Sequence, residues 1–127
     1  MKKILLFLSV MSANSACAFN IDEIDKECSK GLIDEILSCY QSYNDELDEL
    51  IKEKIEDAKV NYENPKLAID TQPLWESYIN KWCSGRNRLS GGWGQLVYYN
   101  CMVDHKIMRL EQLNKYYCTD NGCGKKI

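Results

Sequence analysis

The fold is decided by residues 32–62, LIDEILSCYQSYNDELDELIKEKIEDAKVNY. Apolar side chains recur there every three or four residues for about eight turns, which is the spacing of one helix face. They are Ile33, Ile36, Leu37, Tyr40, Tyr43, Leu47, Leu50, Ile51, Ile55, Ala58 and Tyr62. The other face carries mostly charged residues between Asp45 and Asp57. The pattern predicts a long amphipathic helix whose charged face is solvated, rather than a pair of catalytic carboxylates in a cleft.

Asn64-Pro65 ends this helix, because proline disfavours a helical conformation in the residue before it. A second helix is predicted over residues 66–83. It begins either near Lys66 or after Thr71, which would cap a helix with Pro73 in its first turn.

The second helix carries Trp75, Tyr78 and Trp82, and so much aromatic area is expected in the core rather than in a ligand groove. A third helix is predicted over residues 94–117. It is apolar on more than one side, as expected of a helix that two others contact. The chain is therefore predicted to be all-α, a small antiparallel bundle or hairpin of three main helices, near residues 32–62, 66–83 and 94–117.

An irregular segment from Ser84 to Gly94 is predicted to connect the last two helices. Its glycines match no phosphate-binding spacing, and loops on rigid scaffolds often carry binding residues. The candidate partner-binding residues are Arg86, Arg88, Ser90 and Trp93. A plain connection with Trp93 folded inward is the alternative.

The N-terminus has the order of a secretory signal peptide. Lys2 and Lys3 precede an apolar run at residues 4–11, and small residues follow up to Ala18. We expect cleavage after Ala18, so that residues 1–18 are the signal and residues 19–127 are one domain in the periplasm or secreted. The alternative is a lipoprotein anchored through Cys17. The apolar run is too short to be a permanent membrane span.

Seven cysteines are present, and six remain after this cleavage: Cys28, Cys39, Cys83, Cys101, Cys118 and Cys123. An even number in a small exported chain indicates disulfides, whereas zinc binding would call for close pairs of Cys-x-x-Cys motifs. Counting back from Asn64-Pro65 places Cys83 level with the early part of the first helix. We therefore expect the pairs Cys39–Cys83 and Cys28–Cys101, with Cys118–Cys123 closing a short loop in the tail.

The formal net charge is −3, which makes nucleic acid and anionic membranes poor partners and a basic protein a sensible one. Neither a cofactor nor a metal site is expected. His105 is the single histidine and has no nucleophile at a recognisable spacing, so we expect a structural or solvated role and no enzyme activity. Arg109 lies on a largely apolar helix, where an arginine usually holds a carboxylate or carbonyl groups in place.

Several of these residues together resemble the signature of the LprI-like lysozyme-inhibitor family, long catalogued as a domain of unknown function. They are Gln72, Trp75, Tyr78, Cys83, Gly91-Gly92, Cys101, Arg109 and Leu113, with Cys28, Cys39, Asp48 and Ile51 in the N-terminal half. The resemblance covers about Cys28 to Tyr117. It implies a small, exported helical fold in which Gln72, Trp75, Tyr78 and Arg109 are a structural signature.

Three positions depart from the family pattern. Lys52 replaces the usual Asn, Ile55 replaces a common Tyr, and Asn80 falls near a frequent Arg-Asp pair, while Cys118 and Cys123 lie outside the shared region. The resemblance implies inhibition of a lysozyme-type muramidase. To block hydrolysis, the protein would have to occlude the cleft that holds the enzyme's catalytic carboxylates. The alternative is an envelope interaction or immunity protein that binds a bacterial partner or toxin. A hydrolase is the third possibility, for which no nucleophile, base and orienting group stand at recognisable spacing.

Overall fold

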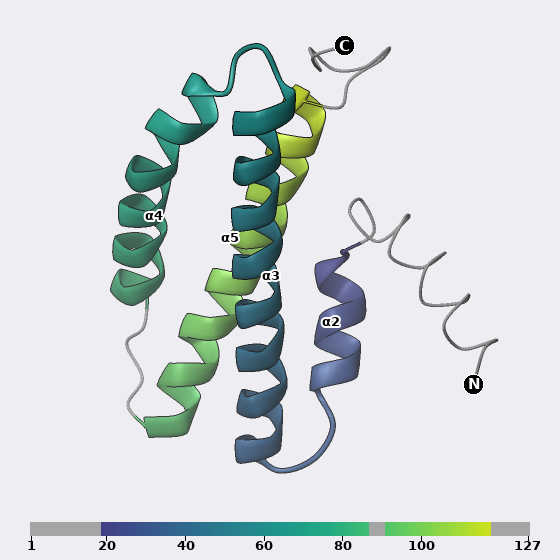
Figure 1. Cartoon of the computed structure of the whole chain (residues 1–127). Helices are drawn as coiled ribbons and strands as arrows, with labels where there is room; N and C mark the ends of the chain where they lie inside the picture. Colours follow the sequence, from purple (N-terminus) through teal and green to yellow (C-terminus); the bar gives the residue numbers. More distant parts are fainter. Residues whose placement is uncertain (1–18, 87–90, 118–127) are drawn as a thin grey trace, which may run out of the picture.

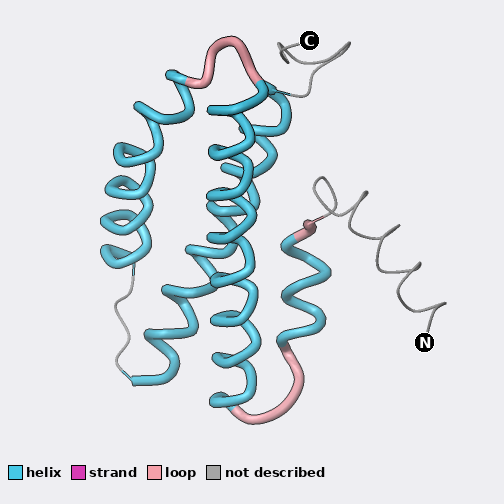
Figure 2. Tube along the Cα trace, in the orientation of Figure 1, coloured by secondary structure: helices cyan, strands magenta, loops and turns pink. Residues whose placement is uncertain are grey.

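A computed structural model describes residues 19–86 and 91–117, which form four α-helices and no β-strand (Figure 2). The helices are α2 (Ile21–Cys28), α3 (Ile33–Asn61), α4 (Lys66–Arg86) and α5 (Gly91–Tyr117). The predicted all-α, disulfide-braced fold is therefore confirmed. None of these four helices is both long and apolar enough to cross a membrane.

The long helices α3, α4 and α5 run alternately up and down, with α2 beside α3 on the side away from α4 (Figure 1). α5 is the central element, since it packs against α2, α3 and α4, and its most extensive interface is with α3. α4 meets α3 only slightly. One face of α4 is therefore held by α5 alone, and this asymmetry sets the position of the site described below.

The short helix α2 is capped at its start by an asparagine side chain. The backbone N–H of Asp22 donates to Oδ1 of Asn20 at 2.8 Å, so Asn20 is the N-cap. Ile24 and Cys28 face the core, one turn apart. Gly31 then turns the chain into α3 with a φ of 100°, in the left-handed region that favours glycine.

α3 matches the predicted helix to within one residue at each end. The backbone N–H of Leu32 donates to Oε1 of Glu35 at 3.2 Å, which satisfies one donor at the start of the helix. Leu47, Ile51 and Ala58 are buried on one side of the helix, as their spacing predicts.

α4 begins at Lys66, so the alternative start after Thr71 is wrong. Pro73 lies inside the helix and is exposed. The hydroxyl of Thr71 donates to the carbonyl of Leu67 at 2.6 Å, within the turn before Pro73. The helix thus continues through a residue that sequence rules place near a helix start.

The connection between α4 and α5 is shorter than predicted. Ser84, Gly85 and Arg86 belong to α4, and α5 begins at Gly91 rather than at Gly94. Gly91 has a φ of 70°, and a Cβ at Gly92 would lie 3.2 Å from Cγ1 of Ile33. The Gly-Gly pair therefore starts a helix and lets it approach α3 closely, instead of forming a loop.

The core fills the space between α2, α3 and α5, and a smaller cluster ties α4 to α5. From α4 only Ala68, Ile79 and Cys83 are buried hydrophobic residues. The expectation that Tyr78 and Trp82 are core residues is wrong, because they are 55% and 47% exposed. Tyr78 lies at the edge of the α4–α5 interface, where its ring contacts His105 of α5 and stacks on Trp82.

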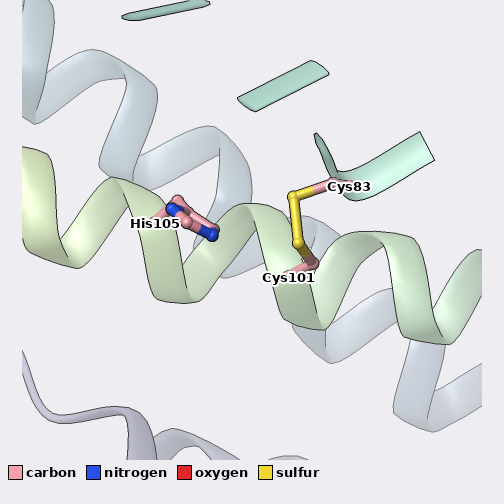
Figure 3. Close-up of side chains that lie close together, drawn as sticks. All are labelled: Cys83, Cys101 and His105. Carbon is pink, nitrogen blue, oxygen red and sulfur yellow. A yellow bond between two sulfur atoms is a disulfide. The ribbon is translucent and has the colours of Figure 1, made fainter. Parts of the chain in front are cut away.

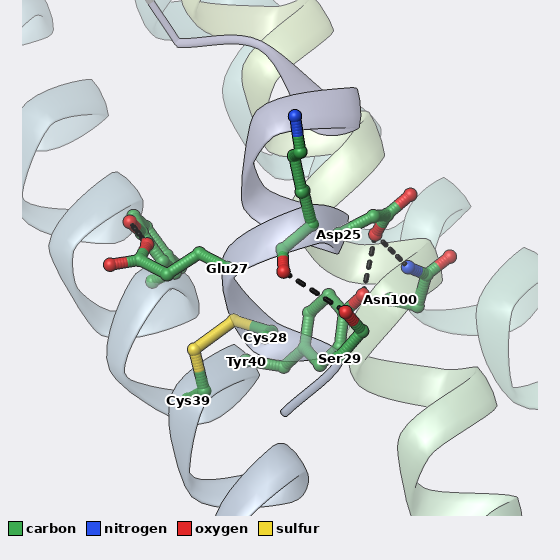
Figure 4. The surroundings of a disulfide bond; sticks show 9 residues. Asp25, Glu27, Cys28, Ser29, Cys39, Tyr40 and Asn100 are labelled. Atoms are coloured by element: carbon green, nitrogen blue, oxygen red, sulfur yellow. Dashed lines mark hydrogen bonds between the residues drawn. A yellow bond between two sulfur atoms is a disulfide. The ribbon is translucent and has the colours of Figure 1, made fainter. Parts of the chain in front are cut away.

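Both disulfides in the described residues join helices that follow each other in the chain: Cys28–Cys39 links α2 to α3, and Cys83–Cys101 links α4 to α5. The predicted pairs Cys39–Cys83 and Cys28–Cys101 are therefore wrong. Cys28 at the end of α2 meets Cys39 of α3 (Figure 4), and Cys83 faces α5 because α4 packs on α5. Cys118 and Cys123 lie outside the described residues.

Candidate functional site

A groove with a volume of about 490 Å³ runs between α4 and α5. Its walls are mainly apolar, and a single charged side chain, that of Arg109, lines it. The lining residues are Leu67, Ala68, Thr71, Leu74, Trp75 and Tyr78 from α4, and Arg109, Gln112, Leu113, Tyr116 and Tyr117 from α5. The volume and the few polar groups are typical of a binding groove in a protein.

Arg109 lies at the floor of the groove and is only 5% exposed. Its Nε donates to Oε1 of Gln72 at 2.9 Å and its Nη2 to Oγ1 of Thr71 at 3.0 Å, with a longer contact to the carbonyl of Ala68. Its Nη1 donates to Oε1 of Gln112 at 2.8 Å. The guanidinium therefore joins α4 to α5 through neutral acceptors.

The charge of Arg109 is not neutralised by any carboxylate within 4.0 Å among residues 19–86 and 91–117. Burial lowers the pKa of Arg109 from its usual value, although a guanidinium stays charged at neutral pH. The ring of Trp75, 5.7 Å from the guanidinium carbon, gives some compensation through its electron-rich face. The carboxylate of Glu76 also favours the charged form of Arg109, although it lies beyond 4.0 Å. A buried cation in an apolar groove, with no directly paired carboxylate, favours an anionic ligand.

A second hollow, of about 320 Å³, lies between α3 and α4 and is acidic. Asp48, Glu49 and Glu56 line it from α3, and Glu76 lines it from α4. Lys52 is the basic residue in the lining. Glu56 is paired with Lys59 at 2.9 Å, and the other carboxylates around this hollow form a surface that attracts basic side chains.

Lys106 is a buried cation of the α3–α5 interface that the sequence did not single out. Its side chain is 5% exposed, and its Nζ contacts Oδ1 of Asp48 and Oδ1 of Asn44, each at 2.6 Å. Asp48 is itself 53% exposed, so it reaches both the buried ammonium and the rim of the acidic hollow. Lys106 thereby anchors one of the carboxylates of that hollow.

Cys83, Cys101 and His105 come together beside the groove, with their potential ligand atoms within 4.8 Å of one another (Figure 3). The two sulfur atoms are joined in a disulfide, so neither is a thiolate that could hold a metal ion. The His105 ring packs edge-on against Tyr78 at 6.2 Å. The group therefore serves as a brace between α4 and α5.

A tyrosine network holds α2 against its neighbours. Oδ1 of Asp25 accepts from the hydroxyl of Tyr40 on α3 and from Nδ2 of Asn100 on α5 (Figure 4). Burial and this bond to Asp25 raise the pKa of Tyr40 to about 12. The hydrogen bond to Glu27, followed by burial, raises the pKa of Tyr43 to about 12. Both phenols are therefore protonated over the neutral range.

The structure brings only some of the predicted residues together. Gln72, Trp75 and Arg109 meet, while Tyr78 lies apart from them on the rim of the groove. Of the candidate partner-binding residues, Trp93 is 60% exposed in the first turn of α5, so it is not folded inward.

Arg86 ends α4, although its side chain is not described, and Arg88 and Ser90 lie outside the described residues. Sequence reasoning missed the roles of Thr71, Leu74 and Gln112 in the groove. The role of Gln112 could have been predicted from its spacing, because it follows Arg109 by three residues and so lies on the same helix face.

Comparison with known proteins gave no match: no family model, no curated protein and no solved structure is similar to this chain. The resemblance to the LprI-like family therefore rests on the quoted residues alone.

Proposed function

We propose that this chain is an exported binding protein that inhibits a lysozyme-type muramidase by covering the enzyme's cleft. The resemblance of its signature residues to the LprI-like family suggests this activity. Three of those residues, Gln72, Trp75 and Arg109, form one contact between α4 and α5, which supports their assignment to the scaffold. The two disulfides agree with maturation in an oxidising compartment such as the periplasm.

The observation that carries the proposal is the acidic hollow between α3 and α4. Host-defence lysozymes are strongly basic, and a cluster of carboxylates raises the rate at which a basic partner associates. The whole chain has a net charge of −3, and loss of Lys2 and Lys3 with the predicted signal would make it −5 (−3 − 2). Glu49, Glu56 and Glu76 would then contact basic side chains at the rim of the enzyme's cleft.

The blocking element in this proposal is the α4–α5 connection with its predicted residues Arg86, Arg88, Ser90 and Trp93. The exposed indole of Trp93 is the kind of rigid aromatic anchor that often dominates a protein interface. A muramidase cleft holds an acid and a nucleophile carboxylate, which arginine side chains can pair with. The chain would therefore act by binding, without chemistry of its own.

The test is a titration of residues 19–127 against chicken-type lysozyme acting on bacterial cell walls. The proposal predicts loss of lysis as the protein approaches a stoichiometric amount. Lysis that is unchanged at a large molar excess of folded protein would exclude the proposal.

Charge variants test the acidic hollow. Glu49→Gln with Glu56→Gln should slow association and reduce its dependence on salt. Glu63→Gln with Glu111→Gln changes the net charge equally on exposed residues that do not line the hollow. Equal slowing by both pairs would indicate a net-charge effect and would remove the hollow from the interface.

A second set of variants tests the blocking element. Alanine at Arg86, Arg88 and Trp93 should weaken inhibition, whereas alanine at Lys115 and Tyr116, at the other end of α5, should not. Full inhibition by the triple variant would leave the connection without a role.

The second candidate function is an envelope interaction or immunity protein that binds a bacterial partner or toxin. The apolar groove between α4 and α5 favours it, because lysozyme inhibition through an acidic surface does not use such a groove. Recovery of one stoichiometric periplasmic partner, together with unimpaired lysozyme, would favour this candidate over the first.

A further inference from the structure

The groove between α4 and α5 leaves an uncovered apolar surface on each of its two walls. On α4, Leu67, Leu74 and Tyr78 are 49%, 71% and 55% exposed, and on α5 Tyr116 is 45% exposed. Exposed apolar side chains that are contiguous along a groove mark an interaction site, whereas scattered ones do not. These four residues all line the same groove.

The charge at the floor of the groove defines the chemistry of the partner. Arg109 is held by Gln72 and Thr71 from α4, and these bonds leave its Nη1 directed at Gln112. Gln112 is an exposed residue of the same helix, so its amide oxygen can be replaced at little cost. A carboxylate oxygen in that position would neutralise the guanidinium and form a shorter, stronger, charge-assisted bond.

The extent of the groove indicates the shape of the partner. Leu67 and Tyr78 are eleven residues apart on α4, which corresponds to about 16 Å, or three helical turns. On α4, the residues that bind Arg109 lie between Ala68 and Gln72. The walls of the groove are apolar on both sides of this position. A fatty acid has its carboxylate at one end and would cover only one of these sides.

We propose that the α4–α5 groove binds an amphipathic helix of a protein partner, with one Asp or Glu of that helix placed on Arg109. Apolar residues of the partner, one and two turns on either side of its carboxylate, contact the exposed leucine and tyrosine side chains. The partner helix occupies the position beside α4 that no helix of the described residues fills (Figure 1). This is recognition of a helix in a groove, with a buried ion pair that fixes its register. The proposal does not depend on lysozyme inhibition.

The probe is a synthetic helical peptide of about five turns, with leucines three, four and seven residues on each side of a central Glu. A matched peptide carries Gln in place of that Glu. Isothermal titration calorimetry on residues 19–127 should give an affinity at least about tenfold higher for the Glu peptide, because only its carboxylate pairs with the buried guanidinium. Equal affinities, or no binding of either peptide at millimolar concentration, overturn the proposal.

Variants at an exposed residue keep the test separate from folding. Q112E puts the chain's own carboxylate beside Arg109 and should abolish the preference for the Glu peptide, while Q112A should retain it. Leu74→Lys should weaken the binding of both peptides. E111Q, at an exposed residue outside the groove, should change the affinity of neither. Lysozyme inhibition should be the same for Q112E and the unmodified protein.

Two other results would assign the groove to a different occupant and so overturn the proposal. One is that dodecanoate binds saturably whereas the peptides do not, and that Q112E abolishes the binding of dodecanoate. The other is self-association of the protein in sedimentation experiments, abolished by Leu74→Lys, which would identify a second copy of this chain.

Discussion

The buried pair between Lys106 and Asp48 gives the sharpest stability prediction. The Lys106 ammonium lies 2.6 Å from Asp48 and 2.6 Å from Asn44, and both partners come from α3. Asp48→Asn keeps the shape of the side chain and removes the only carboxylate that contacts Lys106 in the described part of the chain. The ammonium then stays buried without a compensating charge.

The magnitude follows from the unequal exposure of the two partners. Breaking a fully buried pair costs about 3–5 kcal/mol, but Asp48 is half-exposed, so we expect a loss of about 2–3 kcal/mol in the free energy of unfolding. Lys106→Met removes the buried charge and keeps the apolar stem, and should cost less than about 1 kcal/mol. In the double variant the cost of Asp48→Asn should therefore nearly vanish, giving a coupling of about 2 kcal/mol.

The free energy of unfolding is measured for the unmodified protein, the two single variants and the double variant. The method is urea unfolding followed by far-ultraviolet circular dichroism, with both disulfides intact. Asp45→Asn, on the same helix and exposed, is the control and should change the free energy of unfolding by less than about 0.5 kcal/mol. If Asp48→Asn and Asp45→Asn have the same effect, the ammonium is hydrated rather than buried and the reasoning fails.

Three further predictions concern the α2–α3 half. The contribution of Tyr40 and Tyr43 to stability should be constant below about pH 10 and be lost between pH 10 and 12, because unfolding returns both phenols from a pKa of about 12 to the ordinary value near 10, so the unfolded chain loses these protons first. Leu47→Ala should cost about 3 kcal/mol, since Leu47 is 0% exposed, whereas Val60→Ala, at an exposed site, should cost almost nothing. Gly31→Ala should cost about 1–2 kcal/mol because of its left-handed φ.

Each of these three has a direct check. In thermal melts from pH 8 to pH 12, the melting temperature of Tyr40→Phe should fall less with pH than that of the unmodified protein. An equal fall would contradict the role given to Tyr40. Equal urea midpoints for Leu47→Ala and Val60→Ala would mean that α3 does not pack as described. Gly31→Asn, which tolerates a left-handed backbone better, should be milder than Gly31→Ala, and the reverse order would point to the contact with Glu35 as the cause.

Periodicity predicted the helices well, because the apolar side chains of α3 form one continuous stripe and Asn64-Pro65 is a strong stop. The beginnings of α4 and α5 were less predictable. Both Pro73 and the pair Gly91-Gly92 suggest interruptions, yet each lies within a helix. Tertiary packing decides these cases, as the close approach of Gly92 to Ile33 illustrates.

The disulfide pairing could not be predicted, because it depends on which helices are neighbours rather than on spacing within one helix. Counting residues back from the turn at Asn64-Pro65 would place Cys83 beside α3 only if α4 packed mainly on α3. In the structure α4 packs mainly on α5. The same neighbour relation exposes Tyr78 and Trp82. The groove could therefore not be predicted, because aromatic residues in this pattern usually indicate a core.

The candidate site was partly predictable. An arginine among apolar helix residues indicated a buried hydrogen-bonded group, and Arg109 is one. That no carboxylate lies within 4.0 Å of Arg109 in the described residues depends on three-dimensional neighbours, which no spacing rule reveals. The same holds for Lys106, whose partners Asn44 and Asp48 are about sixty residues away in the chain.

The arrangement of the disulfides divides the molecule into two covalently closed halves. One bridge closes the α2–α3 half and the other the α4–α5 half, and the backbone at residues 62–65 is the single covalent link between them within the described chain. A protease cut at Glu63 would leave two looped fragments that, within the described chain, only noncovalent contacts hold together, among them the bond of Lys106 to Asp48. Such fragments could be produced separately and recombined, so that reassembly reports directly on the strength of the α3–α5 interface.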